Sequence, residues 1–444
     1  MPYQQGYKLP GEKASKLGHL DVLKSPLVQQ LVHSFEQDPP TKPENGDDWQ
    51  PFPPLGKPLD LIFAVDGSIQ VIVDELPPHK ALAFVKTALL RLDQVALSKI
   101  DKETPHPFAL RDLMGESALY HATVFPLRHV QIPNMSVYDA VRETIFQSMK
   151  DASLDGQPME TLKWLVYEKW QSSTKSLPGF QCPHCDNEQA TLPFDAEIGK
   201  CSQCGNKLFI TDMLGFHLEM VEEAASDSVA TAYMSIHETL LLFTGIRYYW
   251  EHDQESLKRC LFIKDGPLQI RAQYSKLVAP IRRFLLTAES KGIPVCLIGQ
   301  EKTGAFVEHL DMISRDVKPN HLYIPDHKYI CEQIQHRPAS GAPYGKDTNY
   351  GAKVFITIGE RYRFVINIPV NESMQTFIIK PEISSLIGIE RILATLPQLL
   401  SSRFENGLMP IELANSVASL STYPSAQVLK LFANTSISSA LIKL

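Results

Sequence analysis

Residues 59–68 read Leu-Asp-Leu-Ile-Phe-Ala-Val-Asp-Gly-Ser, an apolar run that is interrupted at Asp66-Gly67. A largely continuous apolar run of this length predicts a strand that is buried on both faces, as in α/β proteins. Two further apolar runs, residues 259–264 and 294–298, are separated by a segment with helical periodicity. A strand–helix–strand order predicts a right-handed crossover and parallel pairing of the two strands. We therefore expect an α/β core.

Periodicity and capping residues predict the remaining elements. Helices are expected over residues 25–36, 79–93, 136–150, 158–170 and 218–243, and again in the C-terminal part. A short strand is expected at 70–73, and a hairpin at 353–369 that turns near Gly359. Seven prolines between Pro39 and Pro58 predict a linker or an extended arm.

The composition is that of an ordinary globular chain. Of the 444 residues, 44% are hydrophobic and 21% charged, with a formal net charge of −7, which argues against a disordered chain or a generic polyanion binder. The sequence shows no apolar run near the roughly eighteen residues of a membrane helix and no hydrophobic secretory signal, so we expect a cytoplasmic protein without a membrane partner. It also contains no P-loop, no Gly-x-Ser-x-Gly elbow and no His-Glu-x-x-His motif.

Four of the seven cysteines form two Cys-x-x-Cys pairs, Cys182/Cys185 and Cys201/Cys204. Two such pairs can close a tetrahedral shell around Zn²⁺, and Gly205 allows a tight turn after the last thiol. The alternatives are a redox pair or two disulfides, which a reducing cytosol disfavours. Four thiolates leave no open position for a substrate, so we expect a structural zinc ribbon.

Two acidic residues stand where apolar runs end. Asp66 and Asp265 are each followed by glycine, in AVDGS and IKDGP. If the two strands are neighbours, the carboxylates converge at one edge of the sheet, where α/β proteins place their sites. Two converging carboxylates repel each other unless a divalent cation lies between them. Taken alone, an Asp-Gly pair more often marks a turn, and Glu238 in a helix more often lies at its solvated edge.

Four motifs in this order resemble the NurA family of nucleases: IFAVDGS at 62–68, LFIKDGPL at 261–268, IGQEKTGAFVEH at 298–309 and YGKDTNYGAKVFITIG at 344–359. The resemblance covers roughly residues 59–420. It implies a ribonuclease-H-like fold and a divalent-metal nuclease, typically with manganese. It also implies work beside a hexameric HerA-type ATPase that translocates DNA.

The resemblance also implies site residues. The aspartate of the first strand matches Asp66, the aspartate before Gly-x-Leu matches Asp265, and the strand-then-lysine motif matches Lys302. The glutamate of the acidic helix falls on Glu238, with other candidates remaining open at Glu222, Glu223 and Glu255. Lys302 either offsets phosphate charge or is simply solvated.

The sequence departs from the family in two ways. The interval between Asp66 and Glu238 is longer than the family needs, and the zinc ribbon occupies part of it. The family also carries a C-terminal histidine, whose position falls at or near Val417 in MPIELANSVASL; no histidine follows His336. Another group replaces it, or catalysis is altered.

We therefore expect a ribonuclease-H-like mixed sheet core with flanking helices and a small inserted zinc ribbon. The expected domains are an N-terminal helix and Pro-rich arm (1–58), the first part of a nuclease core (59–179), the zinc ribbon (180–208) and the second part of the core (209–444).

The expected function is that of a Mn²⁺- or Mg²⁺-dependent DNA nuclease. Asp66, Glu238 and Asp265 would hold the metal, Lys302 would assist, and the chain would act as a homodimer with a HerA-like hexameric ATPase in DNA end processing or anti-phage defence. The alternative is a catalytically weak or inactive zinc-ribbon module that binds DNA or docks the ATPase.

Overall fold

A computed structural model of the chain describes residues 18–35, 49–74, 77–93, 118–130, 132–171, 177–185, 187–401, 403–404, 406–420 and 427–433. The chain divides into two compact units, Met1–Gly46 and Asp47–Leu444.

The described part of the first unit consists of two short helices, α1 (Gly18–Lys24) and α2 (Pro26–Ser34). The helix predicted at 25–36 is thus confirmed, and it begins with Pro26, whose fixed φ suits the first helical turn. No residue of α2 is buried. Of the predicted Pro-rich arm, residues up to 48 lie outside the described residues.

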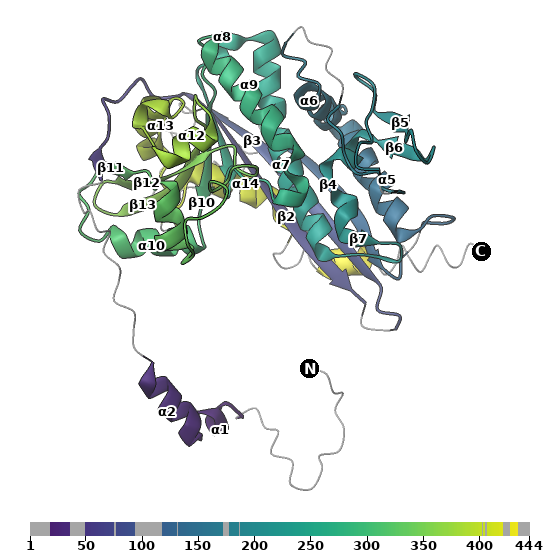
Figure 1. Ribbon diagram of the computed structural model, residues 1–444, viewed down its shortest axis with the longest axis horizontal. Helices are drawn as coiled ribbons and strands as arrows, with labels where there is room; N and C mark the ends of the chain where they lie inside the picture. The colour runs from purple at the N-terminus through teal and green to yellow at the C-terminus, as the bar shows by residue number, and fades with distance from the viewer. Residues whose placement is uncertain are drawn as a thin grey trace. The chain divides into compact units, whose positions relative to one another are not determined.

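The second unit is built on one mixed sheet of eleven strands, in the order β1-β11-β12-β13-β10-β9-β2-β3-β4-β8-β7 (Figure 1). Their bounds are β1 Gln50–Pro51, β2 Leu61–Val73, β3 Ala81–Asp93, β4 Ala118–Arg128, β7 Met220–Val221, β8 Ala224–Ala225, β9 Cys260–Asp265, β10 Cys296–Glu301, β11 His321–Tyr323, β12 Ala352–Ile358 and β13 Tyr362–Ile368. A separate two-stranded sheet pairs β5 (Ile198–Lys200) with β6 (Lys207–Phe209).

The central strands have the ribonuclease-H-like arrangement. Strands β2, β3 and β4 form an antiparallel meander. Strand β9 then pairs parallel with β2, and β10 pairs parallel with β9. The order β4-β3-β2-β9-β10 confirms both the predicted fold class and the predicted parallel crossover. The hairpin predicted at 353–369 is also confirmed, as β12 and β13, and it turns at Gly359 with φ +56°.

Two predictions for the first half of the sheet are wrong. Residues 79–93 do not form a helix, because residues 81–93 are strand β3, paired with β2 along its whole length from Leu61↔Asp93 to Val73↔Ala81. The strand predicted at 70–73 is not separate either, since β2 runs without interruption through Asp66 to Val73. Hydrogen bonding to β2 along the whole strand determines the structure of residues 81–93, although their apolar residues repeat at helical spacing.

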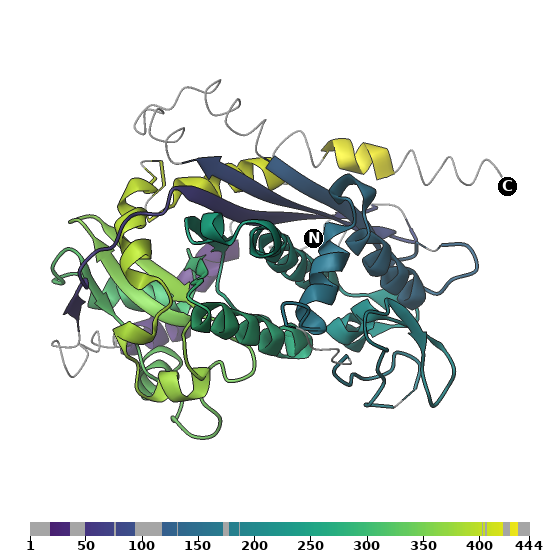
Figure 2. The same cartoon turned by 90° about the horizontal axis from the view of Figure 1, so that it is seen from above.

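Helices cover both faces of the sheet. Their bounds are α5 Val137–Met149, α6 Gln157–Val166, α7 Asp227–His252, α8 Gln254–Leu257, α9 Val278–Ser290, α10 Ala305–Ile313, α11 His327–Tyr329, α12 Met374–Ile379, α13 Ile389–Thr395 and α14 Met409–Ala418. Helices α5, α6, α7 and α9 share one core with Phe63 and Val65 of β2, whereas α13 and α14 share another with Ile62 and Ala64 (Figure 2). The helices predicted at 136–150 and 158–170 are confirmed, and α5 is capped by Ser136 as expected.

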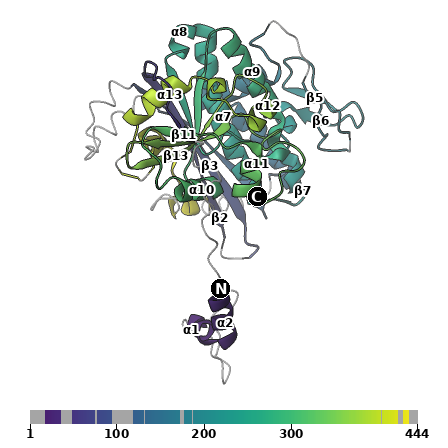
Figure 3. The ribbon, with the colours of Figure 1, turned by 60° about the vertical axis from the view of Figure 1, so that its left-hand side comes forward.

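Helix α7 is the central helix of the unit. It is long and apolar enough to cross a membrane by length and composition, but 72% of its most apolar window is buried within the fold. It begins at Asp227, nine residues later than predicted from the sequence, because residues before it form a 3-10 turn and the short strands β7 and β8. The two-stranded sheet β5–β6 and the hairpin β12–β13 lie at opposite ends of this unit (Figures 1 and 3).

Candidate functional site: an acidic cleft and a four-cysteine cluster

A cleft of about 790 Å³ opens where β9 and β10 end. Its lining brings together the four residues predicted for the active site: Asp66, Glu238, Asp265 and Lys302. The register explains the convergence, because Val65 pairs with Lys264 and Gln300 pairs with Asp265, which sets Asp66, Asp265 and the end of β10 at one level of the sheet.

Asp66 is a buried carboxylic acid whose pKa is raised. It is only 4% exposed; its Oδ1 accepts a hydrogen bond from Gly67 N at 2.7 Å, while its Oδ2 is buried without a partner. Burial, together with the negative charges of Asp265 and Glu238, raises the pKa of Asp66 to about 7. An unpaired buried carboxylate oxygen beside other carboxylates is a position that a cation would stabilise.

Gly67 allows helix α7 to approach strand β2. A Cβ atom at this position would lie 2.5 Å from Glu238 Oε1 and 2.6 Å from Met234 Cγ, both on α7. Only glycine therefore leaves room for the glutamate where it stands. The second glycine of the Asp-Gly pairs, Gly266, has φ +83°, so the chain turns away after Asp265 as the sequence predicted.

Glu238 points into the cleft from α7 and pairs with a buried lysine. Its Oε2 lies 3.0 Å from Lys264 Nζ, and the two side chains are among the buried charged groups of the core. Lys264 Nζ also donates to the backbone oxygen of Asp265 at 3.0 Å. Burial acts to lower the pKa of Lys264, but Glu238, Tyr350 and Asp265 together outweigh burial. The pKa of Lys264 is therefore raised, and the ammonium form is retained.

Asp265 and Lys302 form the outer part of the cluster. Lys302 Nζ lies 3.0 Å from Asp265 Oδ2, and both side chains keep contact with solvent. Arg271, which is exposed, also lines the cleft. The cleft thus combines a buried acidic floor with cations at its rim.

Contacts of His237, the residue next to Glu238, fix the orientation of helix α7 about its own axis. His237 is fully buried, and its Nδ1 lies 2.8 Å from Thr87 Oγ1 on β3. Its ring stacks on His121 at a centroid distance of 4.4 Å, and His121 Nδ1 lies 2.7 Å from Asp151 Oδ2. Burial lowers the pKa of both histidines, so they pack as neutral groups that anchor the helix carrying Glu238.

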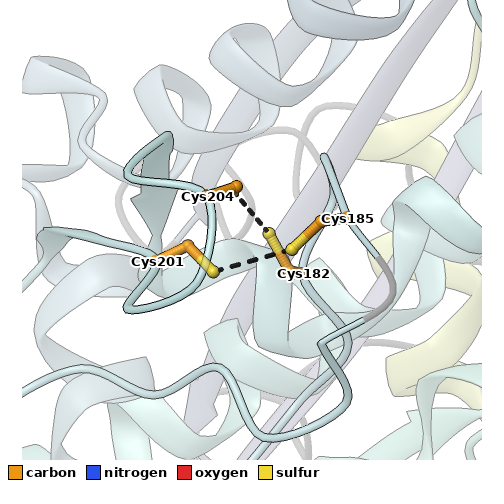
Figure 4. Close-up of side chains that lie close together, drawn as sticks. All are labelled: Cys182, Cys185, Cys201 and Cys204. Atoms are coloured by element: carbon orange, nitrogen blue, oxygen red, sulfur yellow. Dashed lines mark hydrogen bonds between the residues drawn. The ribbon is translucent and has the colours of Figure 1, made fainter.

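The four-cysteine cluster has the geometry of a zinc site (Figure 4). The Sγ atoms all lie within 4.8 Å of one another, with Cys182···Cys204 and Cys185···Cys201 both at 3.8 Å. Four sulfurs about 2.3 Å from a tetrahedral Zn²⁺ would be about 3.8 Å apart, whereas a disulfide needs about 2.05 Å. The four thiols thus lie in one cluster, as the sequence predicted.

The backbone around Cys201 favours its thiolate, whereas burial raises the pKa of Cys182 to about 12. Hydrogen bonds from the backbone of Cys204 and Gln203 lower the pKa of Cys201 to about 6. Gly205 has φ +74° and donates from its backbone N–H to Cys201 O at 2.9 Å, which closes the knuckle as predicted. The donor set and spacing fit Zn²⁺ and leave no open position.

Arg142 of α5 ties the segment that follows β6 to the core. It is 5% exposed and donates from Nε and Nη2 to the carboxylate of Asp212, both at 2.9 Å. Its Nη1 donates to Asp139 at 2.7 Å. A bidentate arginine pair of this kind fixes orientation as well as charge.

Among the residues that the structure describes, only the four cysteines bring three or more ligand atoms within 4.8 Å of one another. The three carboxylates of the cleft are therefore spread more widely than ligands in one closed shell. They fit a cation through the free Oδ2 of Asp66 and the partly exposed Asp265.

Comparisons with known proteins give weak matches only. No family model matches the chain, and no curated protein matches it significantly. The NurA nuclease from Sulfolobus solfataricus is similar at a TM-score of 0.35 and 8% identity, over 95% of this chain and 96% of that one. A second NurA structure is similar at 0.30 and 12% identity, covering 95% and 97%, and one of NurA bound to dAMP and manganese at 0.26 and 11%, covering 94% of each.

All three are NurA structures. They belong to the family that the sequence motifs resemble, and their similarity extends over nearly the whole chain. At these scores the fold assignment rests on the strand order and register described above.

The other candidates for the third acidic residue lie away from the cleft. Glu222 and Glu223 are exposed in the turn between β7 and β8, and Glu255 is 83% exposed and paired with Lys258. Only Glu238 lines the cleft. Near Val417, the position predicted for the family's C-terminal histidine, the residue of α14 that lines the cleft is Asn415. Among the described residues, no histidine lines this cleft.

Sequence reasoning missed Lys264 and Glu301. Glu301 ends β10 in the cleft wall, where its carboxylate pairs with Lys353 and accepts from Asn367 Nδ2 at 2.7 Å. A signal for Lys264 was present, since a lysine inside the apolar run of a buried strand must find a buried partner. Lys353, in strand β12, is 2% exposed and belongs to this interior pairing.

Proposed function

We propose that this chain is a divalent-metal-dependent DNA nuclease. The observation that carries the proposal is the buried, unpartnered Oδ2 of Asp66, held beside Asp265 and Glu238 in a cleft whose rim carries Lys302 and Arg271. Acidic groups that only stabilised the fold would be paired; here one oxygen is left for a cation.

Asp66, Glu238 and Asp265 are the acidic residues that we propose for the metal site. A bound Mn²⁺ or Mg²⁺ would activate water and stabilise the charge that develops on a phosphodiester. Lys302, which Asp265 holds at the rim, offers a point cation to a phosphate oxygen of the substrate, and Arg271 widens the basic rim. The choice of manganese and of DNA follows the motifs that resemble NurA nucleases.

The zinc ribbon has a structural role in this proposal. Its four thiolates close the shell, so Zn²⁺ there supplies folding energy and a rigid surface for docking or DNA contact. We keep the proposed division into an N-terminal arm (1–58), a nuclease core (59–179 and 209–444) and the ribbon (180–208).

We further propose a cytoplasmic homodimer that works with a HerA-like hexameric ATPase in DNA end processing or anti-phage defence. The sequence carries no P-loop to power movement along DNA, and its net charge of −7 gives little general affinity for a polyanion. Helix α2, which buries none of its residues, and its C-cap residue Phe35 offer Leu27, Leu31 and Phe35 for docking.

One observation favours a second candidate function. The residue that α14 presents to the cleft is Asn415, which cannot transfer protons as a histidine does. A chain that binds DNA or the ATPase through its zinc ribbon, with little catalysis, would fit that replacement.

Digestion of end-labelled single- and double-stranded DNA separates the two functions. The zinc-loaded chain should cut DNA when Mn²⁺ is added, and Asp265→Asn should cut at least about 100-fold more slowly, because it loses a charge at the metal site. Asp311→Asn, the same change on the exposed surface of α10, serves as the matched control. DNA binding without any Mn²⁺-dependent cleavage would favour the binding module.

A further inference from the structure

The ion pair between Lys264 and Glu238 is unlike the pair between Lys302 and Asp265 at the cleft. Lys264 is 3% exposed and Glu238 is 4% exposed. Lys264 Nζ is held at two points, 3.0 Å from Glu238 Oε2 and 3.0 Å from the backbone oxygen of Asp265. By contrast, the side chain of Lys302 is 36% exposed and contacts Asp265 from the solvent side. Lys264 is therefore a fixed ammonium inside the acidic cluster.

The carboxylate oxygens of the cluster are occupied unequally. Oε2 of Glu238 is taken by Lys264, and Oδ2 of Asp265 is taken by Lys302. Oδ2 of Asp66 is buried and has no partner. A cation that enters the cleft therefore finds its open oxygen at Asp66, whereas at Glu238 it finds an ammonium already in place.

We propose that Lys264 supplies the second positive charge of this site, so that the cleft binds one divalent cation, next to Asp66 and Asp265, and not two. This inference rests on the proposed metal-dependent function. The three carboxylates and two ammoniums leave one net negative charge, which one divalent cation turns into one net positive charge. A second divalent cation on Glu238 would lie beside the Lys264 ammonium, and like charges repel strongly where water is excluded.

The buried pair also explains why Lys264 cannot simply move aside. An ammonium that leaves Glu238 would lose both of its acceptors while remaining in the core, and separating a buried ion pair is strongly unfavourable. Lys264 thus acts as a positioning residue that holds Glu238 and takes the place of a second metal.

The test counts Mn²⁺ ions bound per zinc-loaded full chain, by titration with Mn²⁺ while the signal of the free ion is followed by electron paramagnetic resonance. We expect one Mn²⁺ per chain. Lys264→Met, which frees Glu238, should bind two, and the double variant Lys264→Met/Glu238→Gln should return to one. Lys380→Met, which removes a lysine whose side chain is 85% exposed, is the matched control and should bind one.

Two Mn²⁺ ions on the unchanged chain, or none, would overturn the inference, as would a single ion on folded Lys264→Met. If Lys264→Met does not fold, the counts for the unchanged chain and the double variant decide. Failure of the proposed function gives a different result: one bound Mn²⁺ without DNA cleavage.

Discussion

Replacing Asp66 with asparagine is expected to make the metal-free chain more stable at about pH 8. The pKa of Asp66 is raised from 3.8 to about 7 by burial and by the charges of Asp265 and Glu238. A shift of roughly three units corresponds to about 4 kcal/mol, the cost of holding this carboxylate ionised in the folded chain. Asparagine removes that cost and keeps the oxygen that accepts from Gly67, but it buries an amide group without a partner, at about 1–3 kcal/mol. The net gain is about 2 kcal/mol.

The gain depends on pH, with a sign that follows from the raised pKa. The folded chain binds the Asp66 proton more tightly than the unfolded chain does, so the unchanged protein recovers stability as pH falls from about 7 to about 4. The advantage of Asp66→Asn should shrink over this range and vanish near about pH 5.

Urea denaturation of the zinc-loaded chain, without Mn²⁺ or Mg²⁺ and followed by tryptophan fluorescence, measures this difference. Asp311→Asn on the exposed surface of α10 should show no such pH dependence. A difference for Asp66→Asn that stays constant with pH, or an Asp66→Asn chain that is less stable than the parent at about pH 8, would refute the reasoning.

Three further predictions concern the zinc cluster, the contact between α7 and β2, and the partner. Cys201→Ser should reduce bound zinc from one ion per chain to none by elemental analysis and expose residues 180–208 to proteolysis, whereas Cys331→Ser, a buried cysteine outside the cluster, should keep its zinc. Gly67→Ala should weaken Mn²⁺ binding at least about tenfold and cost about 1–3 kcal/mol of stability, because its Cβ meets Glu238 Oε1 and Met234 Cγ of α7 and the backbone of β2 next to Asp66 must shift. Gly245→Ala, whose Cβ makes ordinary contacts, should do neither, and equal Mn²⁺ affinities would contradict this account. The full chain co-expressed with a HerA-like ATPase should elute with it as one large assembly in size-exclusion chromatography with light scattering, and deletion of residues 1–58 should abolish this; separate elution of the two full-length proteins would reject the partnership.

The sequence predicted the parts of the fold that local signals control. Ser136 and Pro26 marked helix starts, and the apolar runs at β9 and β10 marked buried parallel strands. Strand β3 could not be recognised in the same way. Val85, Leu89 and Leu92 repeat at helical spacing, but the strand buries residues on both faces and is stabilised by pairing with β2 and β4. Its state therefore depends on contacts outside the segment itself.

In the candidate site, too, local sequence signals predicted some residues, whereas others depend on contacts between separate elements. The Asp-Gly pairs led to Asp66 and Asp265, and their convergence followed from the expectation that the two strands are neighbours. Asp66 does not end its strand, however, because β3 continues to pair with β2 beyond the point where β9 stops. The role of Lys264 depends on α7 crossing β9 at Glu238, and nothing local to IKDGP reveals that contact.

The central claim is that the cleft around Asp66 binds the divalent metal ion that this chain requires to cleave DNA. Its most direct test is the initial rate of cleavage of an end-labelled DNA as a function of Mn²⁺ concentration, for the zinc-loaded chain and for Asp66→Asn. The account predicts cleavage that rises with Mn²⁺ and saturates for the unchanged chain, and no cleavage above background for a folded, zinc-retaining Asp66→Asn. Cleavage by Asp66→Asn at the parental rate and with the parental Mn²⁺ dependence would contradict it.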